Sequence, residues 1–262
     1  MEFIKTLFLQ WGFLSLDAPT IATAWLFVFH RVGQTKSPEP GHYLLLFLAV
    51  WLAYVGDRLL DARKKDPALL SHRHSGYIQR KNRLSLLWLF GFAFATGAGL
   101  LILPMSVFLQ ALGLGGFVII YLLFVQWLPA NAWPLKKIAT GLLFAAGVGF
   151  FAWKSNPKQA DTLLHAQTGF FLLCMWNLWL IRAMECADLT RERPPGSQYL
   201  WGAINLFWLL AVGINHPMLA VCYLSSSLGL LLLSYFKRKR LSFSLFRQLA
   251  DAALLLAPLL VA

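Results

Sequence analysis

The sequence predicts an all-α membrane protein, with about nine transmembrane helices in one bundle. Three observations lead to this prediction. The chain of 262 residues is 58% apolar and only 13% charged, whereas soluble domains carry about 25% charged residues. Long apolar stretches recur over the whole length of the chain. Most of the lysine and arginine residues fall between these stretches, as expected of loops at a membrane surface.

Nine apolar stretches come close to the length of about 20 residues that a helix needs to cross the hydrocarbon core. They span roughly 7–29, 42–60, 84–103, 106–127, 138–153, 164–184, 199–214, 217–236 and 241–261. The fifth and the seventh are the shortest. Helix breakers separate the stretches, for example Pro104 and Pro157. Because no soluble segment interrupts the series, we expect residues 1–262 to form a single transmembrane domain.

The start of the first stretch, after Lys5, is similar to a signal peptide. No small-x-small cleavage pattern follows, and the apolar run continues beyond Asp17 and Pro19. We therefore expect this segment to be retained as the first helix.

The positions of the basic residues predict the orientation of the chain. With a cytoplasmic N-terminus, nearly all of them face the cytoplasm, and the exceptions are Arg31, Lys36, Lys154 and Lys158. The C-terminus is then outside, and a bacterial inner membrane is the simplest location. This loop topology and contact with anionic lipid account for the net charge of +12, so we expect no nucleic-acid partner. The three cysteines form no CxxC pair, which argues against a zinc knuckle or a disulfide framework.

Two acidic clusters end apolar stretches on the predicted cytoplasmic side. Asp57 and Asp61 are one helical turn apart at the end of the second stretch, so their carboxylates share a face. Glu185 and Asp188 end the sixth stretch in the same way. Carboxylates near a helix C-terminus favour cations, because the backbone dipole is negative there. We therefore expect these four residues to be catalytic and to bind Mg²⁺, which prefers oxygen ligands and often bridges substrate phosphates.

Each acidic pair also has a structural explanation. The carboxylates of the second stretch have basic neighbours in Arg58 and Lys64, with which they can form interfacial salt bridges. Arg182 lies one turn before Glu185, and pairing between these two is the simpler expectation. The shared metal site is favoured because both acidic pairs fall on the same predicted membrane face.

Three polar residues lie inside apolar stretches. Asn177 either lines a substrate cavity or forms a hydrogen bond to another helix. Asp251 has Arg247 one turn earlier and is expected to form an intrahelical ion pair. Asp17 precedes Pro19 and is expected to cap a helix that starts at residue 18. If the two aspartates were functional instead, the chain would be an ion-coupled transporter.

A basic segment follows the second stretch and is rich in residue types that bind phosphate. The candidate substrate-binding residues, besides Asn177, are Arg58, Lys64, His72, Arg73, Arg80 and Lys137. One interpretation is a lid that closes over a diphosphate. The alternative is a loop that lies on anionic headgroups, because cytoplasmic loops of membrane proteins are generally basic. Aromatic side chains such as Trp88 are expected to pack rather than to shield a carbocation.

The chain resembles the UbiA-type superfamily of intramembrane prenyltransferases over nearly its whole length. The resemblance rests on nine spans with acidic motifs at the ends of the second and the sixth. It rests also on the local sequences YVGDRLLD at 54–61 and KIATGLLFA at 137–145. It implies a UbiA-like bundle in which two aspartate-rich motifs bind Mg²⁺ and a prenyl diphosphate. It further implies transfer of the prenyl group to an aromatic or other lipophilic acceptor.

The first motif departs from the family pattern, Asn-Asp-x-x-Asp-x-x-x-Asp. When Asp61 is set on the middle aspartate, Asp57 falls on the asparagine, Arg58 on the first aspartate and Lys65 on the last. An arginine at that position repels Mg²⁺ but can hold a phosphate directly. The second motif of the family usually reads Asp-x-x-x-Asp. Asp188 and Glu192 have this spacing, whereas Glu185 and Asp188 are one residue closer together.

The predicted function is that of a UbiA-like prenyltransferase at the cytoplasmic side of the membrane. The expected partners are a prenyl diphosphate, a lipophilic acceptor and membrane lipid. The alternative is a catalytically inactive relative that binds an isoprenoid or lipid, or assists assembly. A CDP-alcohol phosphotransferase fits poorly, because its longer Asp-Gly-x-x-Ala-Arg pattern is missing from the chain.

Overall fold

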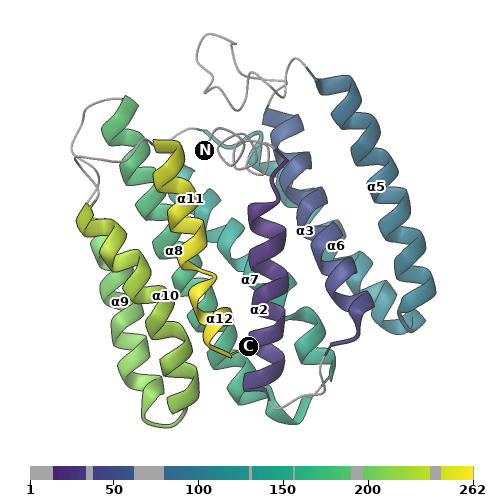
Figure 1. Ribbon diagram of the computed structural model, residues 1–262. Helices are drawn as coiled ribbons and strands as arrows, with labels where there is room; N and C mark the ends of the chain where they lie inside the picture. The colour runs from purple at the N-terminus through teal and green to yellow at the C-terminus, as the bar shows by residue number, and fades with distance from the viewer. Residues whose placement is uncertain are drawn as a thin grey trace, which may run out of the picture. The chain divides into compact units, whose positions relative to one another are not determined.

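The computed structural model describes residues 14–33, 38–61, 80–129, 132–155, 157–189, 197–236 and 243–261. Within these ranges all regular secondary structure is helical, which confirms the predicted all-α class. The elements are α2 (Asp17–Val32), α3 (Pro40–Asp61), α5 (Lys81–Ile102), α6 (Met105–Val125), α7 (Trp133–Ser155), the 3₁₀ helix η3 (Pro157–Gln159), α8 (Ala160–Leu189), α9 (Ser197–Gly213), α10 (Pro217–Phe236), α11 (Phe243–Ala253) and α12 (Leu256–Val261) (Figure 1).

Five helices, α3, α5, α6, α7 and α8, are long and apolar enough to cross a membrane, and they indicate a membrane protein. Two further helices, α9 and α10, are apolar over the shorter described stretches Tyr199–Gly213 and Leu219–Tyr235. Each of the nine predicted stretches contains a helix in its described part. The crossing of the membrane by all nine stays a prediction.

Proline sets the start of several helices. Pro40, Pro134 and Pro217 each occupy the first or second position of a helix. The fixed φ of proline suits this position, and its missing N–H group is not needed there. For this reason α7 begins at Trp133 rather than near residue 138. The fifth stretch, expected to be among the shortest, therefore forms a helix of 23 residues.

The first and last stretches differ from the expected helices at one point each. Ser15 has a positive φ of 58°, and α2 begins after it at Asp17. The carboxylate of Asp17 accepts a hydrogen bond from the backbone N–H of Ala18 at 3.1 Å and so satisfies one of the free donors at the start of the helix. The ninth stretch is divided, because a turn at Leu254 and Leu255 separates α11 from α12.

The chain divides into two compact units. Unit 1 contains residues 1–22 and 39–133, and unit 2 contains residues 23–38 and 134–262. The single domain expected over residues 1–262 stays a prediction.

In unit 1, α3 packs against α5. Val55 and Leu59 of α3 form a buried cluster with Leu84 of α5. The indole N–H of Trp88, which also belongs to α5, donates a hydrogen bond to the carbonyl of Leu52 at 2.8 Å. Trp88 therefore has the packing role expected of it, and the contact fixes α5 beside the second half of α3.

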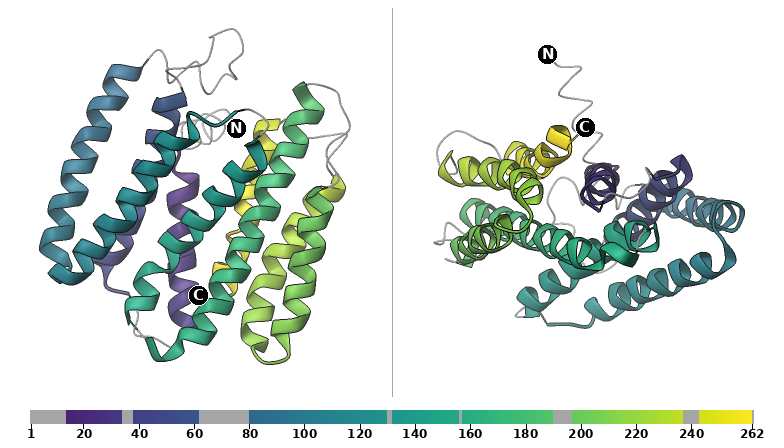
Figure 2. Two further views of the ribbon diagram at one scale, coloured as in Figure 1. Left: turned by 180° about the vertical axis from the view of Figure 1, so that it is seen from behind. Right: turned by 90° about the horizontal axis from the view of Figure 1, so that it is seen from below.

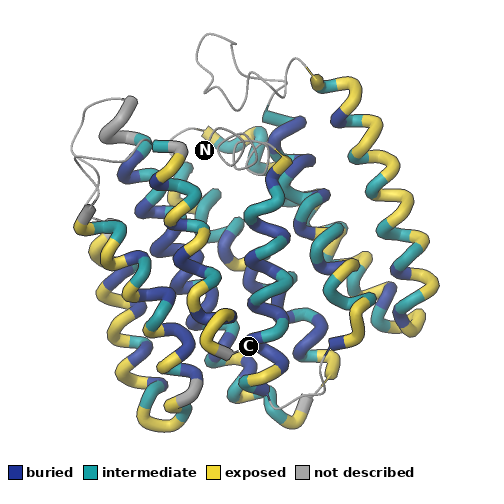
Figure 3. Tube along the Cα trace, in the orientation of Figure 1, coloured by how far each residue is buried: buried dark blue, intermediate teal, exposed yellow. Residues whose placement is uncertain are grey.

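Much of the surface of α5 and α6 is apolar and exposed. Leu86 and Phe90 of α5 are each 71% exposed, and Phe117 of α6 is 68% exposed. Figure 3 shows α5 mainly in the colours of exposed and intermediate residues. Lipid tails are as apolar as these side chains and cover such a surface without the cost that water would impose. This exposure is what helices in contact with lipid require.

Unit 2 is built around α8. The helices α9, α10 and α11 all pack against it, and residues 172–177 in its middle are buried on every side. Trp25 of α2 is fully buried, with its ring 4.6 Å from that of Phe170 and 4.9 Å from that of Tyr223. The indole N–H of Trp25 donates to the carbonyl of Leu254 at 2.8 Å. An aromatic core thus holds α8 and α10 in place.

Candidate functional site

The first acidic pair occupies the last turns of α3, in unit 1. Asp57 and Asp61 are half-buried, and Arg58 between them is buried, with 9% of its surface exposed. Val55 and Leu59, which face α5, are about 160° around the helix axis from Asp57. The two carboxylates therefore lie on the side of α3 that faces away from α5.

A glycine and a tryptophan fix the position of this helix end. A Cβ atom on Gly56 would lie 3.3 Å from Nε1 of Trp88, so a side chain at this position would press on the ring. Trp88 also bonds to the carbonyl of Leu52, one turn before Gly56. Because this contact lies next to Asp57, a packed helix rather than a loop holds the carboxylates, which favours a precise site.

The second acidic pair occupies the last turns of α8, in unit 2. Nη1 of Arg182 lies 2.8 Å from Oε2 of Glu185, and the side chains are 39% and 37% exposed. The expected pairing of these two residues is confirmed. Asp188 belongs to α8, but its side chain lies outside the described part of the structure. The convergence of this pair with Asp57 and Asp61 stays a prediction, because the two pairs belong to different units.

Asn177 lies in the buried middle of α8 and binds to a neighbouring helix. Its amide nitrogen donates to Oδ1 of Asp251 on α11 at 2.9 Å. Nε of Arg247 lies 4.0 Å from Oδ2 of the same aspartate, so the expected ion pair is present. Of the two interpretations of Asn177, the contact between helices is confirmed. These partners account for an acidic side chain at the depth of Asp251 without any transport function.

The candidate phosphate-binding residues beyond α3 are only partly described. Arg80 is exposed just before α5 in unit 1, and Lys137 is half-buried in the first turns of α7 in unit 2. Lys64, His72 and Arg73 lie outside the described residues. The lid that these residues were expected to form therefore stays a prediction.

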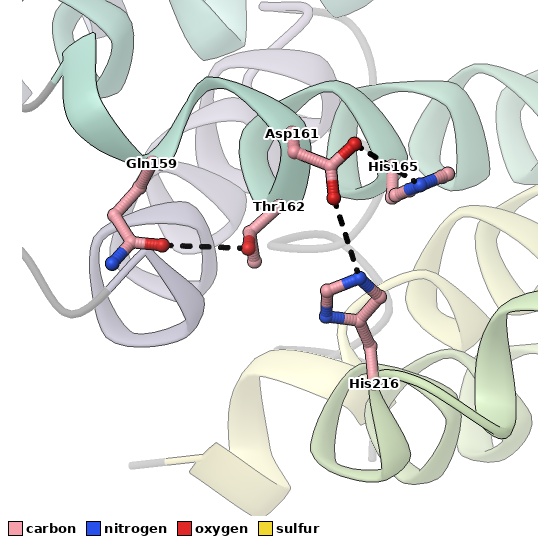
Figure 4. A network of polar contacts seen from close by, with 5 residues as sticks. All are labelled: Gln159, Asp161, Thr162, His165 and His216. Atoms are coloured by element: carbon pink, nitrogen blue, oxygen red, sulfur yellow. Dashed lines mark hydrogen bonds and ion pairs between the residues drawn. The ribbon is translucent and has the colours of Figure 1, made fainter.

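Three residues for which the sequence analysis predicts no role lie close together at the N-terminal end of α8 (Figure 4). Asp161 lies in the first turn of α8 and His165 lies one turn later. His216 lies in the short turn that joins α9 to α10, two helices that run side by side (Figures 1 and 2). Nε2 of His165 is 3.6 Å from Oδ1 of Asp161, and Nε2 of His216 is 3.8 Å from Oδ2. The spacing Asp-x-x-x-His could have indicated the first two residues, whereas no local signal indicates His216.

No family model, curated protein or solved structure matches the chain. The described helices indicate a helical membrane protein, and the helices of the second and sixth apolar stretches carry carboxylate residues in their last turns. The resemblance to UbiA-type prenyltransferases therefore stays a prediction from the sequence.

Proposed function

We propose that this protein is a UbiA-like intramembrane prenyltransferase, which moves a prenyl group from a prenyl diphosphate to a lipophilic or aromatic acceptor. The observation that carries the proposal is the placement of acidic residues in the last turns of two apolar helices. Asp57 and Asp61 end α3, and Glu185 and Asp188 end α8. These helices occupy the second and sixth apolar stretches, as the resemblance to the family requires. The bacterial inner membrane and the cytoplasmic N-terminus are part of the same proposal.

The donor set suits Mg²⁺, because all the proposed ligand atoms are carboxylate oxygens. The half-buried carboxylates of Asp57 and Asp61 lie one turn apart on the same side of α3, so both can reach one ion. At Glu185, Oε2 forms the ion pair with Arg182, and the proposed contact with the metal would use Oε1. Bound Mg²⁺ would polarise the diphosphate and neutralise its charge as the bond to the allylic carbon breaks.

The basic residues would hold the departing diphosphate. Arg58 is already buried beside the two carboxylates, where a guanidinium group can bind phosphate oxygens through two parallel hydrogen bonds. The other proposed phosphate-binding residues are Lys64, His72, Arg73, Arg80 and Lys137. The diphosphate leaves with the electron pair of the broken carbon–oxygen bond. The acceptor then forms its new bond to the allylic carbon and loses a proton.

Transfer of a labelled prenyl group by the purified protein tests this proposal. The substitutions Asp61→Asn and Asp188→Asn should each abolish transfer while the protein level stays unchanged. Glu39→Gln is a matched control, because Glu39 is an exposed carboxylate at the opposite end of α3. Normal turnover in both aspartate variants would reject the assignment.

A specific observation also favours a second candidate, a non-catalytic relative that binds an isoprenoid or lipid. Arg58 stands where the family pattern has an aspartate, and it is buried next to the remaining carboxylates. A buried guanidinium group can bind a diphosphate without metal. For this candidate, binding of a prenyl diphosphate analogue should persist in EDTA and be lost in Arg58→Gln. Loss of binding in EDTA would instead favour the enzyme.

A further inference from the structure

We propose that Asp161, His165 and His216 bind a divalent transition-metal ion, with Zn²⁺ as the ion that suits them best. One carboxylate and two imidazole groups form a ligand set typical of zinc sites. The candidate ligand atoms of the three residues all lie within 4.8 Å of one another. The proposed ligands at the ends of α3 and α8 are carboxylates, so the two kinds of site would select different metals.

The backbone already holds the three ligands in place. Asp161 and His165 are four residues apart on α8, so their side chains leave the same face of the helix. His216 is held by two backbone bonds: its N–H donates to the carbonyl of Val212 at 2.8 Å, and its own carbonyl accepts from Ala220 at 3.1 Å. Metal binding therefore requires side-chain rotation but no new backbone structure.

The ligand atoms of the cluster must move closer together to surround one ion. Zinc bonds of about 2.0–2.1 Å in a tetrahedral site place neighbouring ligand atoms about 3.3 Å apart. The two distances from Asp161 involve different carboxylate oxygens: Oδ1 is 3.6 Å from His165 and Oδ2 is 3.8 Å from His216. With one ligand atom taken from each residue, the three atoms lie within 4.8 Å of one another, so the side chains must rotate to bring them to the spacing around one ion. The carboxylate has room to adjust, since the Asp161 side chain is 79% exposed.

The obvious alternative is a pair of ion contacts between Asp161 and protonated histidines. Such charge-assisted hydrogen bonds are typically about 2.7–2.9 Å long. The observed distances of 3.6 and 3.8 Å are too long for these bonds. They are closer to the spacing of ligands around a shared ion. The rings of His165 and His216, 5.3 Å apart between centroids, also converge on the same carboxylate (Figure 4).

The site would be independent of the proposed prenyltransferase site. At a rise of 1.5 Å per residue, Asp161 is about 36 Å along α8 from Glu185. In the proposed orientation, the start of α8 lies on the side of the membrane away from the cytoplasm. Three protein ligands leave a fourth position for water or another group, and the ion would link the start of α8 to the turn between α9 and α10.

Zinc titration of the full-length protein in detergent tests the proposal. The protein is first stripped with EDTA, the EDTA is removed, and Zn²⁺ is added in competition with a chromogenic chelator. We expect one bound Zn²⁺ per chain, and affinity at least about tenfold lower in His165→Ala, His216→Ala and Asp161→Asn. The matched control is His42→Ala, which removes a half-buried histidine of α3 and should keep the wild-type affinity.

X-ray absorption at the zinc edge of the wild-type complex adds a readout that does not depend on any variant. The zinc shell should contain imidazole nitrogen together with oxygen. Equal affinity in wild type and all three site variants would overturn the proposal, as would loss of binding in the control alone. A zinc shell without imidazole would overturn it as well.

Discussion

The two ends of α8 carry charged clusters of different origin. At one end, Arg182 and Glu185 are three residues apart, and helix geometry alone brings them together. At the other end, Asp161 and His165 share a helical face, but His216 comes from the turn between α9 and α10. A local pair of this kind forms on almost any helix. A cluster that depends on tertiary packing is the stronger indication of a bound ligand, because the fold has to hold it together.

The largest expected effect on the free energy of unfolding comes from zinc bound at the N-terminal end of α8. Zn²⁺ at about 100 times its Kd should raise the free energy of unfolding by about 2.7 kcal/mol, because the ion binds only the folded protein. Unfolding in detergent with denaturant, with Zn²⁺ and with EDTA, measures this difference. At the same Zn²⁺ concentration, His216→Ala should gain no more than about 1.4 kcal/mol, because its affinity is expected to be at least about tenfold lower. A gain of about 2.7 kcal/mol in that variant as well would mean that zinc binds at another site. The cluster at the start of α8 would then not be a metal site.

The middle of α8 should show the next largest effect. Asn177→Leu removes a hydrogen bond to the carboxylate of Asp251, which is only 17% exposed. Hydrogen bonds to charged groups contribute roughly 1.5–3 kcal/mol, so we expect a loss of about 2 kcal/mol in the free energy of unfolding. The double variant Asn177→Leu/Asp251→Leu should lose less than the sum of the two single losses. Strictly additive losses would show that the contact does not contribute.

The smallest effect is expected at the Arg182 end. Arg182→Gln breaks an ion pair whose side chains are both more than a third exposed. Exposed pairs of this kind contribute little after solvent screening, so the free energy of unfolding should fall by less than about 0.5 kcal/mol. Unfolding measurements in the same detergent test this. A loss near 2 kcal/mol would mean that the pair is structural, and Glu185 would then be a poor candidate for a metal ligand.

The positions of the helices can be predicted from the sequence better than the contacts between helices. Apolar stretches bounded by proline place most helix boundaries within a few residues, because membrane-spanning length and proline geometry are local constraints. The start of α2 at Asp17 agrees within one residue with the helix start expected from Asp17 and Pro19, whereas the positive φ of Ser15 was not predicted. The start of α7 at Trp133 was not predicted, because a proline can either separate two helices or stand in the first turn of one. Pro134 does the second, as the second residue of α7.

The same division holds for the polar contacts. Arg182 with Glu185, and Arg247 with Asp251, could be predicted because helical spacing sets their distance. The bond from Asn177 to Asp251 joins residues 74 positions apart, so only the packing of α8 against α11 reveals the partner. The meeting of His216 with Asp161 depends in the same way on how three helices pack.

The most direct test of the proposed function is the binding of a non-hydrolysable prenyl diphosphate analogue to the purified protein, first with Mg²⁺ and then with EDTA. The account predicts binding that requires Mg²⁺, is lost in Asp61→Asn and is retained in Glu39→Gln. Binding that is equally tight in EDTA and unaffected by Asp61→Asn would contradict it, and so would the absence of any binding.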